Sequence, residues 1–431
     1  MRKPLAALTV LLAFAPLAAR GDAQSDLVAQ GNYITRAADC APCHTAPGGR
    51  PFAGGRPFTL PFGVLYSPNI TPDQATGIGG YNDDDWVRML HEGIGRGGRH
   101  LYPAMPYTSY ALMTREDALA IKAYLMSLEP VQAAVPQNQL RFPFNQRWGL
   151  AIWNSLNDSD HRFRPDATKS ADYNRGAYLV EALGHCQECH TPRNVMTGLK
   201  RSKPFAGAEL QGWLAYNLTS DRTSGLGGWT DTELERYLST GQADGHGVAS
   251  GPMAEAVQAS LRYLKPEDLR AMVTYLRGIP AQADGPPAVQ AGSPLATPDT
   301  LGPRLFVQAC AGCHLPSGGG RQSPWAALRG SHTAGDPAGA NLVQVLTQGT
   351  QIETNQGLMF MHAFTGAYTD EELAALGNYT IGQFGFRQGT ITPQEIRMNR
   401  GRAADHAAIA VTEAGDAAPP RVESMATGST P

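Results

Sequence analysis

The feature that most constrains this chain is a pentapeptide, Cys-x-x-Cys-His, which occurs at residues 40–44, 186–190 and 310–314. Two thiols three residues apart lie on one helical turn, where they can add to the two vinyl groups of one haem. The chain has six cysteines, and the three motifs use all of them. The pattern therefore predicts three covalent c-type haems rather than disulfides or zinc sites.

Each motif also supplies an iron ligand, because its histidine directly follows the second thiol. The predicted attachment thiols are Cys40, Cys43, Cys186, Cys189, Cys310 and Cys313. The predicted proximal ligands are His44, His190 and His314.

A methionine is the usual second axial ligand in cytochromes c. Met105 lies 61 residues after the first motif histidine, and Met253 lies 63 residues after the second. These matched distances predict both as axial ligands, although methionine otherwise fills gaps in protein cores. In the third copy we expect Met361. Met359 is a rival, and His362 keeps bis-histidine ligation open.

Length and internal repeats divide the chain into three units. A length of 431 residues suits about three domains of ~150 residues each. The segment 51–54 (Pro-Phe-Ala-Gly) recurs at 204–207, and 67–71 (Ser-Pro-Asn-Ile-Thr) is echoed at 215–219. The third unit lacks both segments. We therefore predict a mainly α, loop-rich fold of three tandem cytochrome c-type domains, each built around one covalent haem.

Helix signals recur in each unit. A helix is expected before each motif, containing Gly31, Gly176 or Gly302. A closing helix is expected to begin after Thr114, at Pro266 and after Thr369, where capping residues or a first-turn proline stand. Tyr124, Tyr275 and Tyr379 are expected to pack on the first helix of their units.

We predict seven segments along the chain: three domains, two linkers and two terminal segments. They are a signal peptide at 1–23, a first domain at 24–129, an apolar linker at 130–172, a second domain at 173–278, a Pro/Ala-rich linker at 279–300, a third domain at 301–385 and a partly disordered tail at 386–431. Aromatic residues at 142–153 suggest that the first linker packs between domains, or on a partner or the membrane.

The N-terminus resembles a secretory signal, with a basic start, an apolar run over residues 5–19 and small residues before Gln24. Cleavage there predicts export to the periplasmic side of the cytoplasmic membrane. No later stretch is apolar enough to span a bilayer, so membrane contact is expected to be peripheral. The net charge of −3 gives no indication of a nucleic-acid partner.

The segments 101–107, 67–72 and 184–193 resemble the triheme cytochrome c subunits of membrane-bound bacterial dehydrogenases. These include the quinone-linked alcohol dehydrogenase and the flavin-linked gluconate, fructose and sorbitol dehydrogenases. The resemblance covers residues 24–385. It implies a catalytic partner subunit that carries pyrroloquinoline quinone or flavin and oxidises an alcohol, sugar or sugar acid. It also implies electron transfer through three haems c to ubiquinone.

Outside these motifs we see no nucleophile–base pair, metal cluster or phosphate loop, so the chain is not expected to catalyse substrate oxidation alone. Two alternative functions stay open. The first is a stand-alone or oxidase-linked multihaem electron carrier, and the second is a multihaem peroxidase or reductase. The last of these requires a haem without a sixth ligand, whereas each unit offers a methionine.

Overall fold

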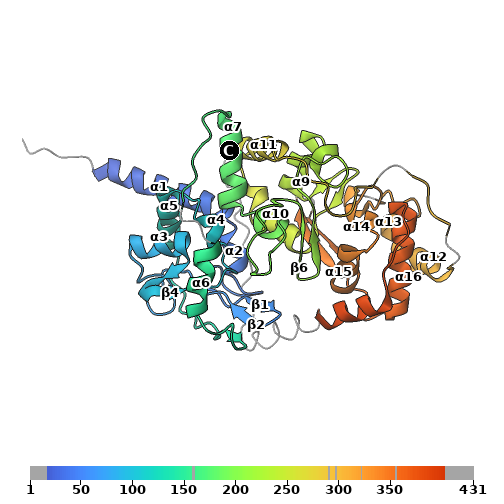
Figure 1. Ribbon diagram of the computed structural model, residues 1–431, viewed down its shortest axis with the longest axis horizontal. Helices are drawn as coiled ribbons and strands as arrows, with labels where there is room; N and C mark the ends of the chain where they lie inside the picture. Colours follow the sequence, from blue (N-terminus) through green and yellow to red (C-terminus); the bar gives the residue numbers. More distant parts are fainter. Residues whose placement is uncertain are drawn as a thin grey trace, which may run out of the picture.

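The computed structural model describes residues 17–157, 161–289, 292–296, 299–321, 323–354 and 357–402. It is largely helical, as predicted, and its strands are short and pair antiparallel. The first unit (24–129), the second unit (173–278) and the third unit (301–385) follow one another from left to right in Figure 1.

The first unit begins with a long helix and ends with a second one, and small strands and short helices lie between them. Its elements are α1 (Leu17–Ala37), α2 (Cys40–Cys43), β1 (Pro57–Leu60), β2 (Gly63–Tyr66), α3 (Asp83–Glu92), β3 (Ile94–Gly95), η1 (Arg96–Gly98), β4 (Arg99–His100), α4 (Tyr107–Tyr110) and α5 (Arg115–Met126). The first linker adds β5 (Gln139–Leu140), which extends the β1–β2 sheet, and α6 (Trp148–Asn157).

The second unit repeats this order. Its elements are α7 (Ala171–Ala177), η2 (Tyr178–Leu183), α8 (Gln187–His190), β6 (Ala208–Leu210), β7 (Trp213–Ala215), η3 (Leu226–Gly228), α9 (Asp231–Thr240), β8 (Gln242–Ala243), β9 (Gly247–Val248), α10 (Gly251–Ala259), η4 (Leu261–Tyr263) and α11 (Pro266–Arg277).

The third unit keeps the first and last helices but replaces the middle with a longer hairpin. Its elements are α12 (Leu301–Leu305), η5 (Phe306–Cys310), α13 (Ala311–His314), η6 (Pro324–Ala326), α14 (His332–Gly335), α15 (Ala340–Gln348), β10 (Thr350–Thr354), β11 (Gly357–Met361), α16 (Asp370–Thr380) and η7 (Ile381–Gly385).

The predicted helix crossing is present in all three units. Helix α1 packs on α5, α7 on α11, and α12 on α16. Gly31, Gly176 and Gly302 lie at the crossings, where an added Cβ would approach the carbonyl oxygen of the closing helix to 1.9, 1.9 and 2.6 Å. The same Cβ would meet the Cβ atoms of the predicted tyrosines at 2.7–2.9 Å. Glycine is required here because the two backbones touch.

The predicted starts of the closing helices are also confirmed. The Thr114 side chain accepts a hydrogen bond from the Asp117 amide, and Pro266 occupies the first turn of α11. Thr369 and Glu372 form a reciprocal capping box at α16. These caps satisfy backbone amides that have no partner within the helix.

The first two units share one hydrophobic core, whereas the third unit has its own. Buried residues of the shared core come from both units, from Ile34 on α1 to Leu276 on α11. The second core gathers around Phe306, Leu373 and Phe384. Ile352 on β10 joins the shared core, so the hairpin of the third unit reaches onto the second.

Both predicted linkers pack against the units that they join. Phe163 donates its amide to the Leu112 carbonyl at 2.9 Å, and its ring lies 5.4 Å from that of Tyr178. In the second linker, the Ala288 amide donates to the Thr223 carbonyl. No described helix combines the length and the apolar character that crossing a bilayer requires.

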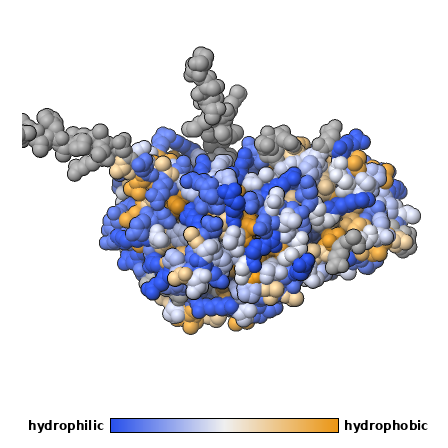
Figure 2. Space-filling view, turned by 90° about the horizontal axis from the view of Figure 1, so that it is seen from above, coloured by the Kyte–Doolittle hydropathy of each residue, from blue (hydrophilic) through white to orange (hydrophobic). Residues whose placement is uncertain are grey.

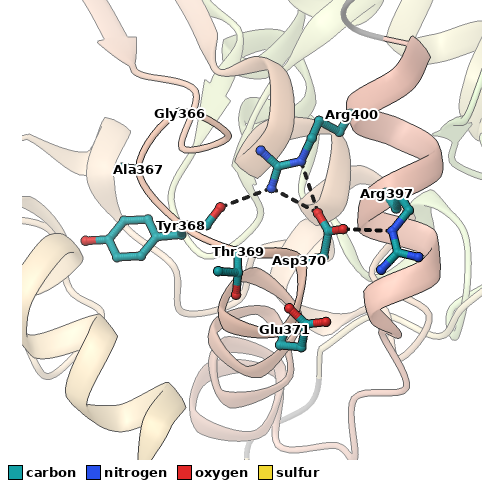
Figure 3. Close-up of a pocket in the computed structure, with 8 residues that line it drawn as sticks. All are labelled: Gly366, Ala367, Tyr368, Thr369, Asp370, Glu371, Arg397 and Arg400. Carbon is teal, nitrogen blue, oxygen red and sulfur yellow. Dashed lines mark hydrogen bonds and ion pairs between the residues drawn. The ribbon is translucent and has the colours of Figure 1, made fainter.

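The predicted tail begins as a packed segment. Ile391 and Ile396 are buried, and residues 393–402 form a helix. Figure 3 shows how this helix is held: Arg397 and Arg400 each donate to the Asp370 carboxylate at 3.0 Å, at the start of α16. The expected end of the third domain at 385 thus falls inside a packed region. Residues 1–16 of the predicted signal peptide and residues 403–431 of the predicted tail lie outside the described residues.

Candidate haem sites

The three motif histidines make the same hydrogen bond. His44 Nδ1 lies 2.8 Å from the Pro68 carbonyl oxygen, and His190 Nδ1 lies 2.6 Å from that of Tyr216. His314 Nδ1 lies 2.7 Å from the Ala326 carbonyl oxygen. A carbonyl accepts only from a protonated nitrogen, so this bond fixes the proton on Nδ1 and leaves Nε2 to bind a metal. The geometry fits a proximal haem ligand in each unit.

The repeated segments explain how the first two carbonyls are held. Asn69 Oδ1 accepts from the Thr71 amide at 2.9 Å, and Asn217 Oδ1 accepts from the Thr219 amide at 2.8 Å. The accepting carbonyls belong to the residues directly before these asparagines. The Asn-x-Thr echo in the sequence therefore marks the segment that orients the proximal histidine.

The other echo closes the loop after each motif. In both units a threonine follows the motif histidine, and its hydroxyl accepts a hydrogen bond from the backbone amide of a buried phenylalanine. The Phe52 amide donates to Thr45 at 3.1 Å, and the Phe205 amide donates to Thr191 at 2.9 Å. The two phenylalanines have φ angles of 62° and 59°, in the left-handed region. Since this conformation costs free energy outside glycine, the surrounding packing must impose it.

Electrostatics at the motifs suit a neutral imidazole and protonated thiols. Burial lowers the pKa of His44, His190 and His314, which favours the neutral form that binds metals. Burial raises the pKa of Cys43 to about 12 and that of Cys189 to about 11. All six cysteines are free of disulfides, so each thiol pair is available for attachment. No group of three or more His, Cys, Asp or Glu side chains in the described part of the chain is arranged to hold a metal ion.

The first two candidate methionines lie on different kinds of element. Met105 stands in the loop between β4 and α4, whereas Met253 is in the first turn of α10. Both are partly buried and pack against the shared core, as do Cys40 and Cys186. The structure thus brings each predicted sulfur ligand to the same core as its thiols.

The hairpin of the third unit separates its two candidate methionines. Met361 packs against the core that contains Cys310, whereas Met359 pairs with Ile352 and packs against the shared core of the first two units. His362 is exposed, and its ring contacts Phe360 at 4.8 Å. These placements support Met361 as the ligand predicted for the third haem.

The first two motifs lie against each other's methionine segments. Glu188, inside the second motif, accepts a hydrogen bond from Thr108 at 2.9 Å, three residues after the candidate methionine of the first unit. Conversely, Glu255 lies two residues after the candidate methionine of the second unit and forms an ion pair with Arg56. Arg56 also donates to the Pro42 carbonyl inside the first motif at 2.8 Å. The contact is reciprocal, so the two sites face each other.

The second and third units meet through a different set of contacts. Tyr216 is the residue whose backbone carbonyl bonds the second motif histidine. Its ring lies 4.9 Å from the His332 ring of the third unit. Asn341 bonds both the amide and the carbonyl of Leu214, at 2.7 and 3.0 Å. This interface therefore combines neutral polar and aromatic groups with an ion pair between Arg262 and Glu353, whose atoms lie 3.6 Å apart.

Sequence reasoning alone did not identify the carbonyls of Pro68, Tyr216 and Ala326. The repeated Asn-x-Thr segment was the available signal for the first two. The third unit lacks that segment, so no signal marked Ala326. Arg56, Glu188 and Glu255 were also missed, because single charged residues carry no pattern of their own.

Two protein families match parts of the chain. The cytochrome c family matches residues 28–129, and the family described as cytochrome c oxidase, cbb3-type, subunit III matches residues 298–379. These matches contain the first and third motifs. Cytochrome c domains are therefore present in the chain.

Similar proteins extend over most of the chain. The fructose dehydrogenase cytochrome subunit of Gluconobacter japonicus is 38% identical, over 86% of this chain and 82% of that protein. The gluconate 2-dehydrogenase cytochrome c subunit of Pantoea cypripedii is 36% identical, over 93% and 95%. The cytochrome c subunit of the quinone-linked alcohol dehydrogenase of Gluconobacter oxydans is 32% identical, over 88% and 83%. The predicted resemblance is confirmed: the chain belongs to the family of cytochrome c subunits of fructose, gluconate and quinone-linked alcohol dehydrogenases.

Proposed function

We propose that this chain carries three covalent haems c, one in each of three tandem domains, and transfers electrons from a dehydrogenase subunit to ubiquinone. The observation that carries the proposal is the threefold repetition of one site. In each unit a thiol pair precedes a histidine whose Nδ1 bonds a backbone carbonyl, and a methionine packs in the same core.

When bound, each haem supplies one-electron redox chemistry at the iron. The protein's own residues set the conditions for it. The Nδ1–carbonyl bond orients the imidazole, and hydrogen bonding there makes Nε2 a more basic ligand. Met105, Met253 and Met361 would each supply a second iron ligand, which would close the iron to substrates and raise its potential. This supports electron transfer over the peroxidase or reductase alternative.

The partner follows from the family. We infer that it is a catalytic subunit carrying pyrroloquinoline quinone or flavin, which oxidises an alcohol, sugar or sugar acid. The chain itself is proposed to lack this activity. We place the complex at the periplasmic face of the cytoplasmic membrane, after cleavage of the signal peptide, because haem attachment to such motifs in bacteria occurs outside the cytoplasm.

The first test is cofactor content and activity of the purified mature chain. A pyridine haemochrome assay together with the mass of the denatured protein should give three haems per chain. With an artificial acceptor, the isolated chain should show no turnover of ethanol, fructose, sorbitol or gluconate. Two haems or fewer would overturn the three-site proposal, and substrate turnover by the isolated chain would overturn the electron-transfer role.

The second test is electron delivery. The chain should be co-expressed with a dehydrogenase large subunit of the fructose, gluconate or alcohol type, and substrate should then reduce the haems in the complex. A short-chain ubiquinone should reoxidise them. A complex in which substrate leaves the haems oxidised, or in which quinone leaves them reduced, would contradict the proposal.

A further inference from the structure

Helix α6 carries an apolar stripe that nothing in the described structure covers. Trp148, Ile152 and Leu156 are spaced four residues apart, which places them on one side of the helix. Their exposed fractions are 69%, 54% and 60%. Helix α6 has no buried residue and no charged residue. In Figure 1 it lies in the lower half of the first unit, between α4 and β4.

The opposite side of α6 is fixed to the protein. Trp153 Nε1 donates to the Met196 carbonyl at 2.7 Å. Asn154 donates to the Glu92 carbonyl at 3.2 Å and accepts from the Tyr107 hydroxyl at 2.7 Å. The helix is therefore held in place with its stripe facing outward.

Further exposed apolar side chains extend the patch on neighbouring loops. Phe142 and Phe144 precede the helix, and the Phe144 ring stacks on Phe62 with centroids 4.1 Å apart. Val195 and Met196 are exposed on the loop that bonds Trp153. By contrast, the face drawn in Figure 2 is largely hydrophilic, with apolar residues in separate small patches. We call the residues around α6 the α6 patch; they are Phe142, Phe144, Trp148, Ile152, Leu156, Val195 and Met196.

The three segments that frame the α6 patch have one sign of charge. Residues 93–107, 139–157 and 193–203 contain eight arginines and lysines and no aspartate or glutamate, although the whole chain has a net charge of −3. The segments meet here, because Arg147 donates to the His100 carbonyl at 2.5 Å and Tyr102 donates to that of Phe144 at 2.9 Å.

Most of these cations have no partner that would neutralise them. Arg193 pairs with Glu188, and Lys203 pairs with Asp284. Within the described ranges, the other six form no ion pair; they are Arg96, Arg99, Arg141, Arg147, Lys200 and Arg201. An apolar helix face with exposed tryptophan and a rim of unpaired cations is the pattern of a helix that lies in a membrane interface.

We propose that the α6 patch docks on an anionic lipid surface, with α6 lying parallel to the membrane and its stripe at the boundary between headgroups and acyl chains. The apolar stripe supplies hydrophobic burial, and the basic rim supplies attraction to phosphate headgroups. The proposal deepens the proposed function and rests on it for the periplasmic setting. Lipid binding by the purified chain needs no electron transfer, so failure of the lipid-docking proposal can be told apart from failure of the proposed electron-transfer function.

The test is flotation of the purified, haem-loaded mature chain with vesicles. Binding should be strong to vesicles of phosphatidylglycerol and phosphatidylcholine, weaker to phosphatidylcholine alone, and reduced by added salt. Trp148→Ser/Ile152→Ser/Leu156→Ser should lower the partition coefficient by about tenfold or more. Arg141→Gln/Arg201→Gln should lower it by about fivefold for each charge removed, for the anionic vesicles only.

The matched control is Leu358→Ser/Phe360→Ser on β11, which removes equally exposed apolar side chains (54% and 59%) outside the α6 patch. It should bind vesicles like the wild type. Haem spectra and melting temperatures should be unchanged in all variants, because the altered side chains are exposed.

Wild-type protein that fails to float, or a triple variant that floats equally well, would overturn the proposal. It would also be overturned if the triple variant kept lipid binding but lost the dehydrogenase subunit, because the α6 patch would then be a protein interface.

Discussion

The first two units and the third unit form the same histidine–carbonyl hydrogen bond, but different kinds of segment supply the carbonyl. In the first two, the carbonyl precedes an Asn-x-Thr turn that the sequence repeats. In the third, it belongs to Ala326 at the end of η6. The candidate methionine likewise comes from a loop, a helix and a strand in turn. The bond between the motif histidine and a backbone carbonyl is kept in all three units, whereas the segments that supply the carbonyl and the methionine differ.

The units also differ in how they are stabilised. The first two share one core, and their sites contact each other reciprocally through Glu188 and Arg56. The third has its own core and contacts the second through rings, an asparagine and the β10–β11 hairpin. Changes in the first pair should therefore spread to both units, whereas changes in the separate core of the third unit should remain local.

The largest expected effect comes from removing one haem, and it should differ between the shared core and the core of the third unit. Cys186→Ser/Cys189→Ser and Cys310→Ser/Cys313→Ser should each lower the haem content by one third. Loss of the second haem should destabilise the first two units together, by at least about 3 kcal/mol, the cost of emptying the space of one buried aromatic side chain. Loss of the third should leave the melting of the first two unchanged. Equal destabilisation of the first two units by both variants would contradict a separate third core.

A second comparison concerns the hairpin. Met361→Ala should leave one of the three irons without its sixth ligand, so about one third of the haem absorbance should acquire a high-spin spectrum. Met359→Ala should leave the spectrum unchanged and lower the free energy of unfolding by about 1–2 kcal/mol, because the methionine is partly buried. The opposite outcome, a spectral change with Met359→Ala alone, would reassign the ligand.

The interface of the second and third units should depend on pH. Burial, and then the nearby His246 and Arg387, lower the pKa of His332 to about 4. The fold thus favours the neutral ring. The stability that the neutral His332 ring allows should be fully present above pH 6.5. As the pH falls toward 4, the free energy of unfolding should drop by up to about 3 kcal/mol.

Melting of the third unit between pH 7 and 4 measures this effect. His332→Phe keeps a ring against Tyr216 and removes the titration, so its melting temperature should fall less over the same range. An identical pH profile in wild type and variant would show that other groups control the interface.

The smallest expected effect concerns the interface of the first two units. Arg56 and Glu255 form a two-point ion pair that is partly open to solvent. A double-mutant cycle of Arg56→Ala and Glu255→Ala should give a coupling of about 0.5–1 kcal/mol, which high salt reduces. A coupling that does not change with salt would mean that packing, rather than charge, joins the two sites.

Much of this arrangement could be predicted because it depends on local patterns. The motif spacing located the thiols and histidines, and the repeated glycines located the helix crossings. The caps at Thr114, Pro266 and Thr369 are set within four residues of chain, so the sequence marks them directly. The end of the third domain was harder to place, because Ile391 and Ile396 are apolar residues without a clear period that pack on a distant core.

The sequence by itself determined the chemistry: three thiol pairs, three motif histidines and the membership of a family of cytochrome subunits. It did so because covalent attachment needs fixed residue types at fixed short spacing. Only the tertiary structure decided which carbonyl orients each histidine, which methionine of the hairpin belongs to the third core, and that the first two sites face each other. Those choices join residues up to 199 positions apart, as in the Arg56–Glu255 pair. Packing of the whole chain brings such residues together, and no local spacing records it.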